Sequence, residues 1–416
     1  TKCLHAGYTP KNGEPRVVPI VQSTTYVYDS TDEVASVFDE PTKSLIYSRF
    51  ANPTVMAVEE KIAALEGGVG AMCTSSGQAA SLLSILNLCN AGDSFLATAE
   101  IYGGTVNLFT HTLKKLGIEC IYIEKGMTDE EIDALFKPNT KAVFGETIAN
   151  PALTVLDIER YANIAHRHGV PLIVDNTFAT PVLCKPFDFG ADIVIHSTTK
   201  YMDGHAVQGG GIIVDSGKFD WTNGNFPDFT EPDVTYHGIS YTETYGKAAY
   251  IIKARMQLMR DFGAYPAAHS AFLLNLGLET LALRMERYCE NALKVAKYFE
   301  QSDKIESVTY PGLESDENHA LAEKYLKGSS GVISIVIKGG RDNAVKFMDS
   351  LKLASNEVHV ADIRTCVLHP ASETHRQLSD EQLVLAGIEP GMVRFSVGLE
   401  NVDDIIEDIE QALANI

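Results

Sequence analysis

Two charged side chains of the sequence stand where apolar runs end. Asp175 directly follows the run Leu172–Val174. A short polar turn leads from the run Ile193–Ile195 to Lys200. Charged groups at the ends of buried strands are costly unless they are paired or used. A lysine amine can bind an aldehyde covalently and a carboxylate can hold a pyridinium proton, so together they suit pyridoxal phosphate (PLP). Singly, such an aspartate is more often a helix cap, and such a lysine more often reaches solvent.

A turn of small residues at 75–79 could hold the phosphate of this cofactor. It follows an apolar run at 69–74 and opens a helical segment with Gly77 and Gln78 in its first turn. Free backbone amides at a helix N-terminus and the helix dipole favour a phosphate, although an ordinary tight turn explains the same residues. The turn is neither a Walker A loop nor a nucleophile elbow. Tyr102 could stack on the cofactor ring, or it could be a turn tyrosine with a satisfied hydroxyl.

The elements that must position these groups alternate along the chain. Apolar runs predict strands, and amphipathic segments predict helices between them. Such a pattern indicates a mostly parallel sheet covered on both faces, with ligands bound beyond the carboxyl ends of its strands. The last run follows another directly and is expected to break the parallel pattern. The predicted strands are 69–74, 93–98, 118–123, 141–145, 170–174, 191–195 and 211–214, and the predicted helices are 53–66, 77–89, 104–115, 129–136 and 157–168.

Changes in the alternation of predicted strands and helices divide the chain into three segments. Residues 1–52 show little periodicity and are expected to form an extended arm. Residues 53–250 carry the predicted sheet and form a large cofactor-binding domain. Residues 251–416 are expected to form a smaller α+β domain. This last part combines helical stretches at about 247–262, 267–300 and 402–415 with apolar β-runs at 331–337 and 392–397.

Composition excludes several classes of function. The chain has 416 residues and a net charge of −21, which is the wrong sign for binding nucleic acid or an anionic membrane. No segment approaches the roughly 18–20 uninterrupted apolar residues of a membrane span. The first residues lack the pattern of a signal peptide. The seven cysteines are scattered without a C-x-x-C pair, which indicates reduced thiols and predicts a cytoplasmic protein.

The histidine pairs make poor metal ligands. His166 and His168 stand two residues apart on a predicted helix and point to different faces. His369 and His375 have no cysteine or carboxylate at matching spacing, so structural roles are favoured for both. No metal site is predicted.

The segment Gly190–Tyr201, which contains Lys200, resembles the cofactor-lysine signature of the Cys/Met-metabolism PLP-dependent enzymes. The resemblance covers essentially the whole chain, with the matching blocks in the family's order. It implies an α/β fold of the PLP-dependent transferase type I (aspartate-aminotransferase-like) class, with a mostly parallel mixed sheet in the large domain and a smaller α+β C-terminal domain. The other matching blocks are Tyr47–Thr54, Ser75–Gly77, Glu146–Pro151, Val174–Thr177, His369–Ser372 and Val393–Glu400.

The resemblance also implies roles for matched residues. Lys200 would bind the cofactor covalently and move protons, Asp175 would keep the ring nitrogen protonated, and Tyr102 would stack on the ring and assist proton transfer. Arg394 would pair with the substrate carboxylate. The other implied cofactor contacts are Gly77, Gln78, Asn150, Ser197 and Thr199, together with Tyr47 and Arg49 from a neighbouring subunit.

An arm that completes another subunit's site implies a homo-oligomer, expected to be a tetramer built from dimers that share active sites. The arm's Tyr47 would also contact the substrate. The segment Val358–Asp362 departs from the family, because relatives tend to have Ser or Asn and a Gly before this aspartate. His359 is therefore predicted to be a third substrate contact beside Arg394 and Tyr47.

An aromatic segment at 216–246 indicates the subgroup. It is similar to that of O-acetylhomoserine sulfhydrylases, whereas cystathionine γ-synthases, cystathionine γ-lyases and methionine γ-lyases have a much shorter connection. Gly104 also stands where methionine γ-lyases typically carry cysteine. The implied reaction is a γ-replacement in methionine and cysteine biosynthesis, which converts O-acetyl-L-homoserine and sulfide, or a small thiol, to L-homocysteine, or methionine, and acetate.

Three alternatives remain open from the sequence: a cystathionine γ-synthase, a γ-lyase, and a protein that keeps the fold only for binding or regulation. The joint presence of Lys200, Asp175, Tyr102 and Arg394 argues against the last of these.

Overall fold

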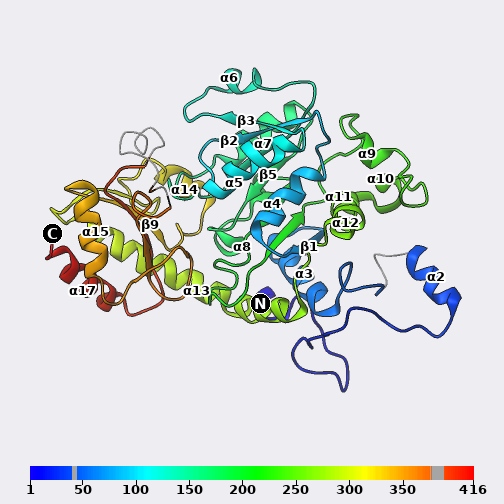
Figure 1. Cartoon of the computed structure of the whole chain (residues 1–416), viewed down its shortest axis with the longest axis horizontal. Coiled ribbons are helices and arrows are strands. Elements are labelled where there is room, and N and C mark those ends of the chain that lie inside the picture. Colours follow the sequence, from blue (N-terminus) through cyan, green and yellow to red (C-terminus); the bar gives the residue numbers. More distant parts are fainter. Residues whose placement is uncertain (40–44, 375, 377–387) are drawn as a thin grey trace.

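The computed structural model describes residues 1–39, 45–374, 376 and 388–416 of the chain. A seven-stranded sheet forms the centre of its larger part (Figure 1). Six of the strands are parallel, and β7 runs antiparallel to both of its neighbours, so the expected break in the pattern is confirmed. In order across the sheet, the strands are β1 (Gly70–Thr74), β7 (Gly211–Asp215), β6 (Ile193–His196), β5 (Leu172–Asp175), β4 (Thr140–Glu146), β2 (Ser94–Thr98) and β3 (Glu119–Ile123).

Most of the helices that pack against this sheet follow one of its strands in the chain, and the first of them precedes β1. Every residue of β2, β6 and β7 is buried, which is why these strands are apolar almost throughout. The predicted helix at 104–115 continues without a break from a short α-helix into a π-helical turn. These helices are α3 (Pro53–Glu66), α4 (Gly77–Leu86), α5 (Gly103–Asn107) with η1 (Leu108–Leu113), α6 (Asp129–Asp133), α7 (Ile158–Arg167), α8 (Thr180–Leu183) and the 3₁₀ turn η2 (Pro186–Phe189).

The first long helix begins and ends where its sequence predicts. The Asn52 side chain accepts hydrogen bonds from the backbone N–H groups of Thr54 and Val55, at 3.0 and 3.4 Å. These bonds satisfy two of the amide groups that a helix leaves unpaired at its start. Gly67 ends the helix with a φ of 89°, a conformation that glycine adopts without strain.

A second sheet of five strands lies in the C-terminal part, where it is antiparallel except for the β10–β11 pair. Of its strands, the sequence predicted β9 and β12, whose apolar runs are the longest. It missed three strands that are shorter or half-exposed. The strands in order are β10 (Ser355–Asn356), β11 (Cys366–Leu368), β12 (Met392–Ser396), β9 (Val332–Ile337) and β8 (Ile305–Thr309), and the helices of this part are α14 (His319–Tyr325), α15 (Gly340–Ser350) and α17 (Val402–Leu413).

One long helix, α13 (Ala268–Glu300), joins the two parts (Figure 1). Leu274 and Leu281 near its start belong to the core of the large sheet. Val295 and Phe299 near its end belong to the core of the second sheet. The helical stretch before it consists of η3 (Gly246–Ala248), α11 (Ala249–Lys253), the π-helical turn η4 (Ala254–Met259) and α12 (Arg260–Phe262).

The aromatic segment 216–246 packs on the first core. The Trp221 ring stacks on the rings of Phe229 and Tyr250, with centroids 4.7 and 5.2 Å apart. All three side chains are buried. The segment also contains two short helices, α9 (Pro227–Thr230) and α10 (Tyr241–Tyr245).

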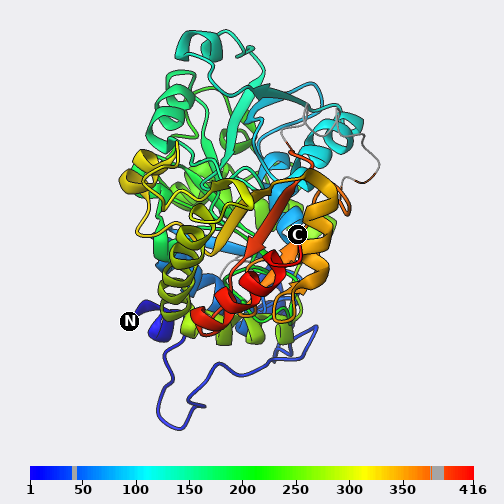
Figure 2. The same ribbon diagram turned by 90° about the vertical axis from the view of Figure 1, so that its left-hand side faces the viewer.

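The N-terminal residues begin beside α3 and α13 and then run away from the body of the molecule (Figures 1 and 2). They contain a short helix α1 (Lys2–His5) and a helix α2 (Thr31–Asp39), which the sequence analysis did not predict. Apolar side chains of this arm are exposed, among them Val27 at 96% and Phe38 at 51%. Exposed apolar side chains on an extended segment are typical of a surface that another chain covers.

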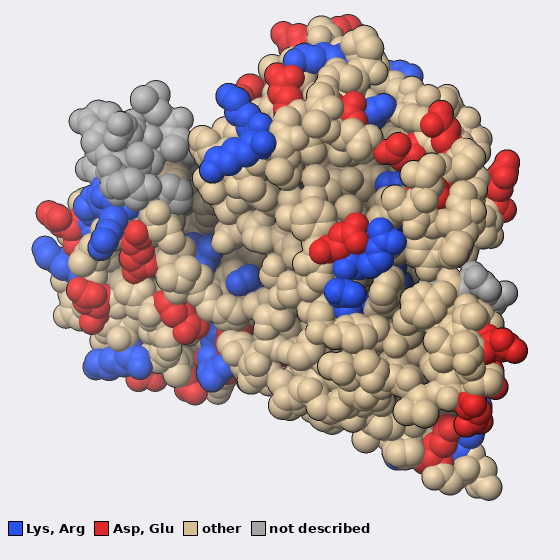
Figure 3. All heavy atoms as spheres, turned by 45° about the vertical axis from the view of Figure 1, so that its right-hand side comes forward, with Lys and Arg blue, Asp and Glu red and all other residues tan. Residues whose placement is uncertain are grey.

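Within the described residues, no helix is both long enough and apolar enough to cross a membrane. On the face shown in Figure 3, acidic and basic side chains are interspersed, and no continuous basic surface is seen on that face.

Candidate active site

The carboxyl ends of β4, β5 and β6 lie side by side and bring the predicted groups together. In the parallel register, Glu146 of β4 lies beside Asp175 of β5, and Asp175 lies beside Ile195 of β6. The turn that carries Lys200 leaves β6 at the same edge. Asp175 and Lys200 therefore reach one site from neighbouring strands, as strand ends in an open α/β sheet predict.

Asp175 is held by the threonine that follows it. The backbone N and the side-chain Oγ1 of Thr177 donate hydrogen bonds to Asp175 Oδ1, at 2.9 and 2.5 Å. No hydrogen bond to Oδ2 is found among the described residues. Burial raises the pKa of Asp175, and the bonds from Thr177 oppose that rise. A cation opposite Oδ2, such as a protonated ring nitrogen, would favour the charged carboxylate.

Glu146 is a carboxylate of this site to which the sequence analysis gave no role. Its Oε1 accepts a hydrogen bond from the backbone N of Tyr102 at 2.7 Å, and its Oε2 accepts one from the backbone N of Asn150 at 3.3 Å. Burial and the neighbouring Asp175 carboxylate raise the pKa of Glu146 well above its usual range. Glu146 thus anchors two segments that carry predicted site residues. Its position at the end of an apolar strand was the available signal.

A second buried carboxylate, Glu66 at the end of α3, also had no predicted role. Its Oε1 lies 2.6 Å from His196 Nε2, and both side chains are fully buried. Asn176 donates a further bond to the same oxygen at 3.0 Å. The pair fixes the residues next to Asp175 and Ser197. Since Glu66 and His196 are 130 residues apart in the chain, no local pattern pointed to this contact.

The Lys200 amine is partly buried and weakly basic. The backbone around it forms a turn, with Lys200 N donating to the Ser197 carbonyl at 3.2 Å and Gly204 N donating to the Lys200 carbonyl at 2.8 Å. Burial, followed by repulsion from the Arg394 guanidinium, lowers the pKa of Lys200 to about 8. A larger fraction of neutral amine is therefore present at neutral pH than for an ordinary lysine, which suits attack on an aldehyde.

Three of the four residues predicted to bind phosphate lie close together. Ser76 caps the start of α4, so the amides of Gly77 and Gln78 stand at a free helix N-terminus. A Cβ atom at Gly77 would lie 2.6 Å from Ser197 Cβ, so only glycine allows the turn after β6 to approach this closely. Thr199, the fourth, stands two residues farther along the same turn, where its Oγ1 accepts a hydrogen bond from a backbone N–H at 3.0 Å.

Tyr102 lies beside Gln78, close to Gly104. Its side chain is 49% exposed. A Cβ atom at Gly104 would lie 2.5 Å from the Tyr102 ring and 2.7 Å from Gln78 Nε2, so the absence of a side chain there makes room for both. The Oε1 of Gln78 is buried and has no hydrogen-bond partner among the described residues.

Arg394 on β12 reaches the site from the second sheet. Its Nη1 donates to Asn150 Oδ1 at 3.2 Å, and its Nη2 donates to the His359 carbonyl at 3.0 Å. The residue is 6% exposed, and within the described part of the chain no carboxylate lies within ion-pair distance of it. Its Nε is buried without a partner there. A buried guanidinium without an anion is a site that a carboxylate fits.

Tyr47 and Arg49 contact each other in the arm of the chain. The Arg49 guanidinium is 5.3 Å from the centre of the Tyr47 ring. Its Nε is buried without a partner among the described residues. Neither side chain hydrogen-bonds to any of the site residues above within that part of the chain.

The histidines considered as metal ligands have structural contacts. His166 Nε2 lies 2.8 Å from Asp192, and His168 Nε2 lies 2.8 Å from Asp133. His369 Nε2 lies 2.8 Å from a backbone carbonyl. Of these residues, the sequence favoured a structural role for His369, as it did for His375. His375 lies outside the described residues.

The donor set fits pyridoxal phosphate. The amine has a lowered pKa and matches the aldehyde of that group. The carboxylate has one oxygen without a partner among the described residues and matches the ring nitrogen, and the glycine at a helix N-terminus matches the phosphate. The residues that supply them are Lys200, Asp175 and Gly77.

Comparisons with known proteins point to the same cofactor. The model of the family described as Cys/Met metabolism PLP-dependent enzyme matches residues 1–414. An O-acetyl-L-homoserine sulfhydrylase of Leptospira meyeri is 44% identical over 100% of this chain and 96% of its own length. A homocysteine synthase of Schizosaccharomyces pombe is 47% identical over 99% of this chain and 96% of its own.

A solved structure of a similar protein has the same fold. It is a putative O-acetylhomoserine (thiol)-lyase from Campylobacter jejuni, solved with N'-pyridoxyl-lysine-5'-monophosphate, that superimposes with a TM-score of 0.94 at 36% identity and covers 99% of both chains. This similarity confirms the predicted fold class. The chain belongs to the family of Cys/Met metabolism PLP-dependent enzymes.

Proposed function

We propose that this chain catalyses a γ-replacement that converts O-acetyl-L-homoserine and sulfide, or a small thiol, to L-homocysteine, or methionine, and acetate. The observation that carries the proposal is the 44–47% identity, over essentially the full length, to relatives named O-acetyl-L-homoserine sulfhydrylase and homocysteine synthase. In the overall reaction the bond between Cγ and the acetate oxygen breaks, and a bond between Cγ and sulfur forms.

Each site residue then has a defined task. Bound pyridoxal phosphate supplies an electron sink for charge that develops at Cα. Lys200 Nζ accepts the proton from Cα and returns it, and its lowered pKa suits both steps. Asp175 holds the proton of the ring nitrogen, and Tyr102 stacks on the ring and assists proton transfer. Arg394 binds the substrate carboxylate through its guanidinium.

The remaining contacts bind the phosphate, the ring and the substrate. The amides of Gly77 and Gln78 at the start of α4, with the hydroxyls of Ser197 and Thr199, would hold the phosphate. Asn150 would contact the ring hydroxyl through its amide NH₂ group, since its Oδ1 already accepts a bond from Arg394. The substrate contacts proposed beside Arg394 are Tyr47 and His359.

We further propose a homo-oligomer, a tetramer built from dimers that share active sites. The arm 1–52 would contact a neighbouring subunit and supply it with Tyr47 and Arg49, which make no hydrogen bond to the site within the described part of their own chain. The arm's exposed apolar side chains support such a contact. The proposed division into a cofactor-binding domain at 53–250 and a C-terminal domain at 251–416 accords with the separate sheets. A cytoplasmic location is proposed because the seven cysteines are unpaired.

One panel of assays tests the reaction. Purified protein is incubated with O-acetyl- or O-succinylhomoserine, each combined with sulfide, methanethiol or cysteine, and the products are separated and identified. We expect the fastest turnover with the acetyl ester and sulfide or methanethiol. Faster product formation from the succinyl ester and cysteine would assign a cystathionine γ-synthase instead. Release of a thiol from methionine alone at a comparable rate would assign a γ-lyase.

Arg394→Ala is expected to raise the KM for O-acetylhomoserine about 100-fold, because the charged hydrogen bonds of a bidentate pair contribute about 3 kcal/mol together. The visible absorption of the bound cofactor should change little. Steady-state kinetics at several ester concentrations measure the effect. Arg394→Lys keeps the charge but not the two parallel donors, so its KM should lie between those of the wild type and of Arg394→Ala. An unchanged KM would remove Arg394 from the substrate site.

A further inference from the structure

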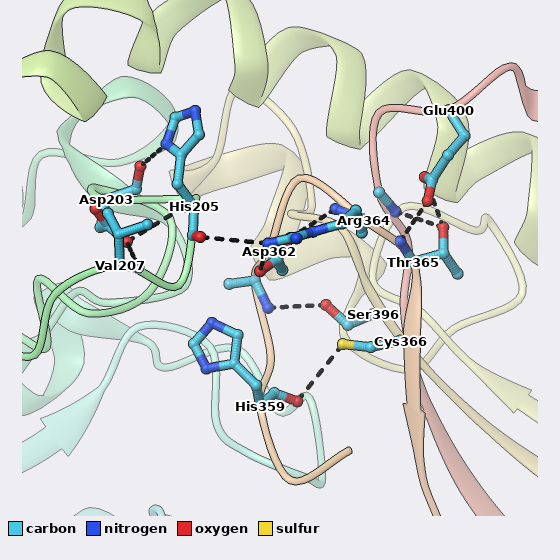
Figure 4. A network of polar contacts seen from close by, with 12 residues as sticks. Asp203, His205, Val207, His359, Asp362, Arg364, Thr365, Cys366, Ser396 and Glu400 are labelled. Atoms are coloured by element: carbon cyan, nitrogen blue, oxygen red, sulfur yellow. Dashed lines mark hydrogen bonds and ion pairs between the residues drawn. The ribbon is translucent and has the colours of Figure 1, made fainter. Parts of the chain in front are cut away.

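The imidazole of His359 faces the amine of Lys200. His359 Nδ1 lies 3.5 Å from Lys200 Nζ, and these residues are 159 positions apart in the chain. The other ring nitrogen, Nε2, is buried and has no hydrogen-bond partner among the described residues. Figure 4 shows the ring projecting from its loop without a side-chain partner among the residues drawn. Lys200 is thus the one hydrogen-bond partner found for this side chain in the described part of the chain.

The loop that carries His359 is fixed to the segment that follows Lys200. Ile363 N donates to the Gly204 carbonyl at 2.8 Å. Arg364 Nη2 donates to the His205 carbonyl at 3.3 Å, and its Nε pairs with Asp362 at 2.8 Å (Figure 4). Because these bonds tie the two segments together, the position of His359 relative to Lys200 does not depend on side-chain packing alone.

The backbone of His359 is held from the second sheet. Its carbonyl accepts a hydrogen bond from Arg394 Nη2 at 3.0 Å. It also accepts one from Cys366 Sγ at 3.6 Å (Figure 4). Two residues farther along, Ala361 N donates to Ser396 Oγ at 2.8 Å. The backbone therefore binds Arg394 while the side chain turns to Lys200, and one residue contacts two of the groups assigned to the reaction.

The surroundings disfavour the charged form of this imidazole. Burial and the nearby Lys200 amine lower the pKa of His359, while carboxylates farther off oppose the shift. A neutral ring has one lone pair, and a lysine ammonium offers only donors. When the ring is neutral and Lys200 is protonated, Nδ1 therefore accepts the bond and the ring proton resides on Nε2. The charged or titratable groups that act on the pair are Arg394, Cys366, Asp362, Glu357 and Asp203.

We propose that His359 is a positioning residue for Lys200: its Nδ1 accepts a hydrogen bond from the amine whenever Lys200 is not bound to the cofactor. The bond holds the released amine in one place for its next proton transfer. This inference deepens the proposed function, since it rests on Lys200 as the proton carrier. It is independent of which ester or thiol the enzyme prefers.

A matched pair of variants tests the role of the acceptor atom at His359 Nδ1. In His359→Asn, the side-chain oxygen can occupy the position of Nδ1 and accept the same bond. His359→Leu has the same branched shape and no acceptor. Both variants are prepared as holoenzyme, and the visible absorption of the cofactor confirms that each is loaded. The measured quantity is the rate at which methionine exchanges its Cα proton in D₂O, followed by NMR, because this exchange requires no thiol and no leaving group.

We expect the exchange rate to fall about 100-fold in His359→Leu, the usual effect of a misplaced catalytic group, and to stay within about 3-fold of the wild type in His359→Asn. The concentration of methionine that gives half-maximal exchange should change little in either. Equal rates in the two variants, or a change confined to the half-maximal concentration, would overturn the proposal and leave His359 as a substrate contact.

A second measurement separates this proposal from the function on which it rests. In cofactor-free protein, the pKa of Lys200 is obtained from the pH dependence of its acylation, followed by mass spectrometry of the peptide that contains it. Leucine excludes water as histidine does but offers no acceptor, so the pKa of Lys200 should fall below about 8 in His359→Leu. In His359→Asn, the pKa of Lys200 should remain at the wild-type value of about 8. Equal values would refute the hydrogen bond even if no amino acid were turned over.

Discussion

Lys200→Ala is expected to remove the visible absorption that the cofactor acquires on covalent attachment, and to lower kcat by at least about 10³-fold. The residue is assigned both the bond to the cofactor and the proton transfer at Cα, so one substitution removes two functions. Lys200 is the only lysine in the segments that directly follow β4, β5 and β6, which are residues 147–157, 176–179 and 197–210. Absorption spectra and turnover of the purified variant measure the result, and borohydride reduction followed by peptide mass spectrometry locates the attachment.

Lys253→Met is the matched control for this variant. Lys253 is also a buried lysine whose pKa falls to about 8 by burial, but its amine donates to the Asn87 carbonyl at 3.2 Å and lies over the Phe229 ring, outside the site. Its replacement should leave colour and turnover in place. A Lys200→Ala protein that keeps both the reducible cofactor and the γ-replacement would disprove the assignment of Lys200.

The same variant probes the sharing of sites between subunits. Lys200→Ala and Arg49→Ala proteins should each be nearly inactive when pure. If Arg49 serves a neighbour's site, subunits of the two kinds that are unfolded and reassembled together will form some sites with an intact Lys200 and an intact Arg49. About a quarter of the wild-type activity is the upper range expected from random pairing of two chains in a symmetric dimer. Activity that never recovers on mixing would contradict a shared site.

The residues at the strand ends could be predicted because their position follows from the sheet type. In a parallel sheet, every carboxyl end meets the same edge, so an apolar run that ends at Asp175 places its carboxylate without any knowledge of strand order. The same reasoning applied to the run that ends at Glu146 would have found that carboxylate too. Local sequence also located both ends of α3, since Asn52 caps its first turn and Gly67 ends its last turn.

Contacts between distant segments could not be predicted in this way. The pairing of Glu66 with His196 and of Lys200 with His359 joins positions 130 and 159 residues apart, and nothing in either local pattern names the partner. The strand β11 is only three residues long and forms because β12 offers it a partner. Such elements depend on tertiary pairing rather than on intrinsic propensity.

Asp175→Asn is expected to keep the cofactor attached through Lys200 and to lower kcat/KM by about 10³-fold. Asn retains an oxygen that can accept both bonds from Thr177, so the local geometry should survive, whereas the negative charge that holds a proton on the ring nitrogen is lost. Retained visible absorption with lost turnover is the diagnostic result. Asp188→Asn, the same substitution at an exposed carboxylate, should change neither quantity.

Although Asp175→Asn should lower the activity, it is expected to raise the stability of the cofactor-free protein. Burial raises the pKa of Asp175 in the folded state, so folding disfavours its charge, and the neighbouring Glu146 is affected in the same direction. A raised folded pKa means that the stability present below the ordinary pKa of about 3.9 is lost as the pH rises through the folded value. The cofactor-free Asp175→Asn protein should therefore unfold at a higher temperature than the cofactor-free wild type at pH 7, and the difference should vanish below about pH 4.

Thermal unfolding from pH 4 to pH 8, with Asp188→Asn as reference, measures this dependence. A variant that is less stable than the wild type at pH 7 would show that the Asp175 charge is compensated within the chain, and the free Oδ2 would then no longer indicate a missing cation. A variant that is both more stable without the cofactor and nearly inactive with it would show that the Asp175 charge is not compensated within the chain. In that case, the charge that the folded chain disfavours is the one that the reaction requires, as expected for a carboxylate placed to hold a ligand's proton.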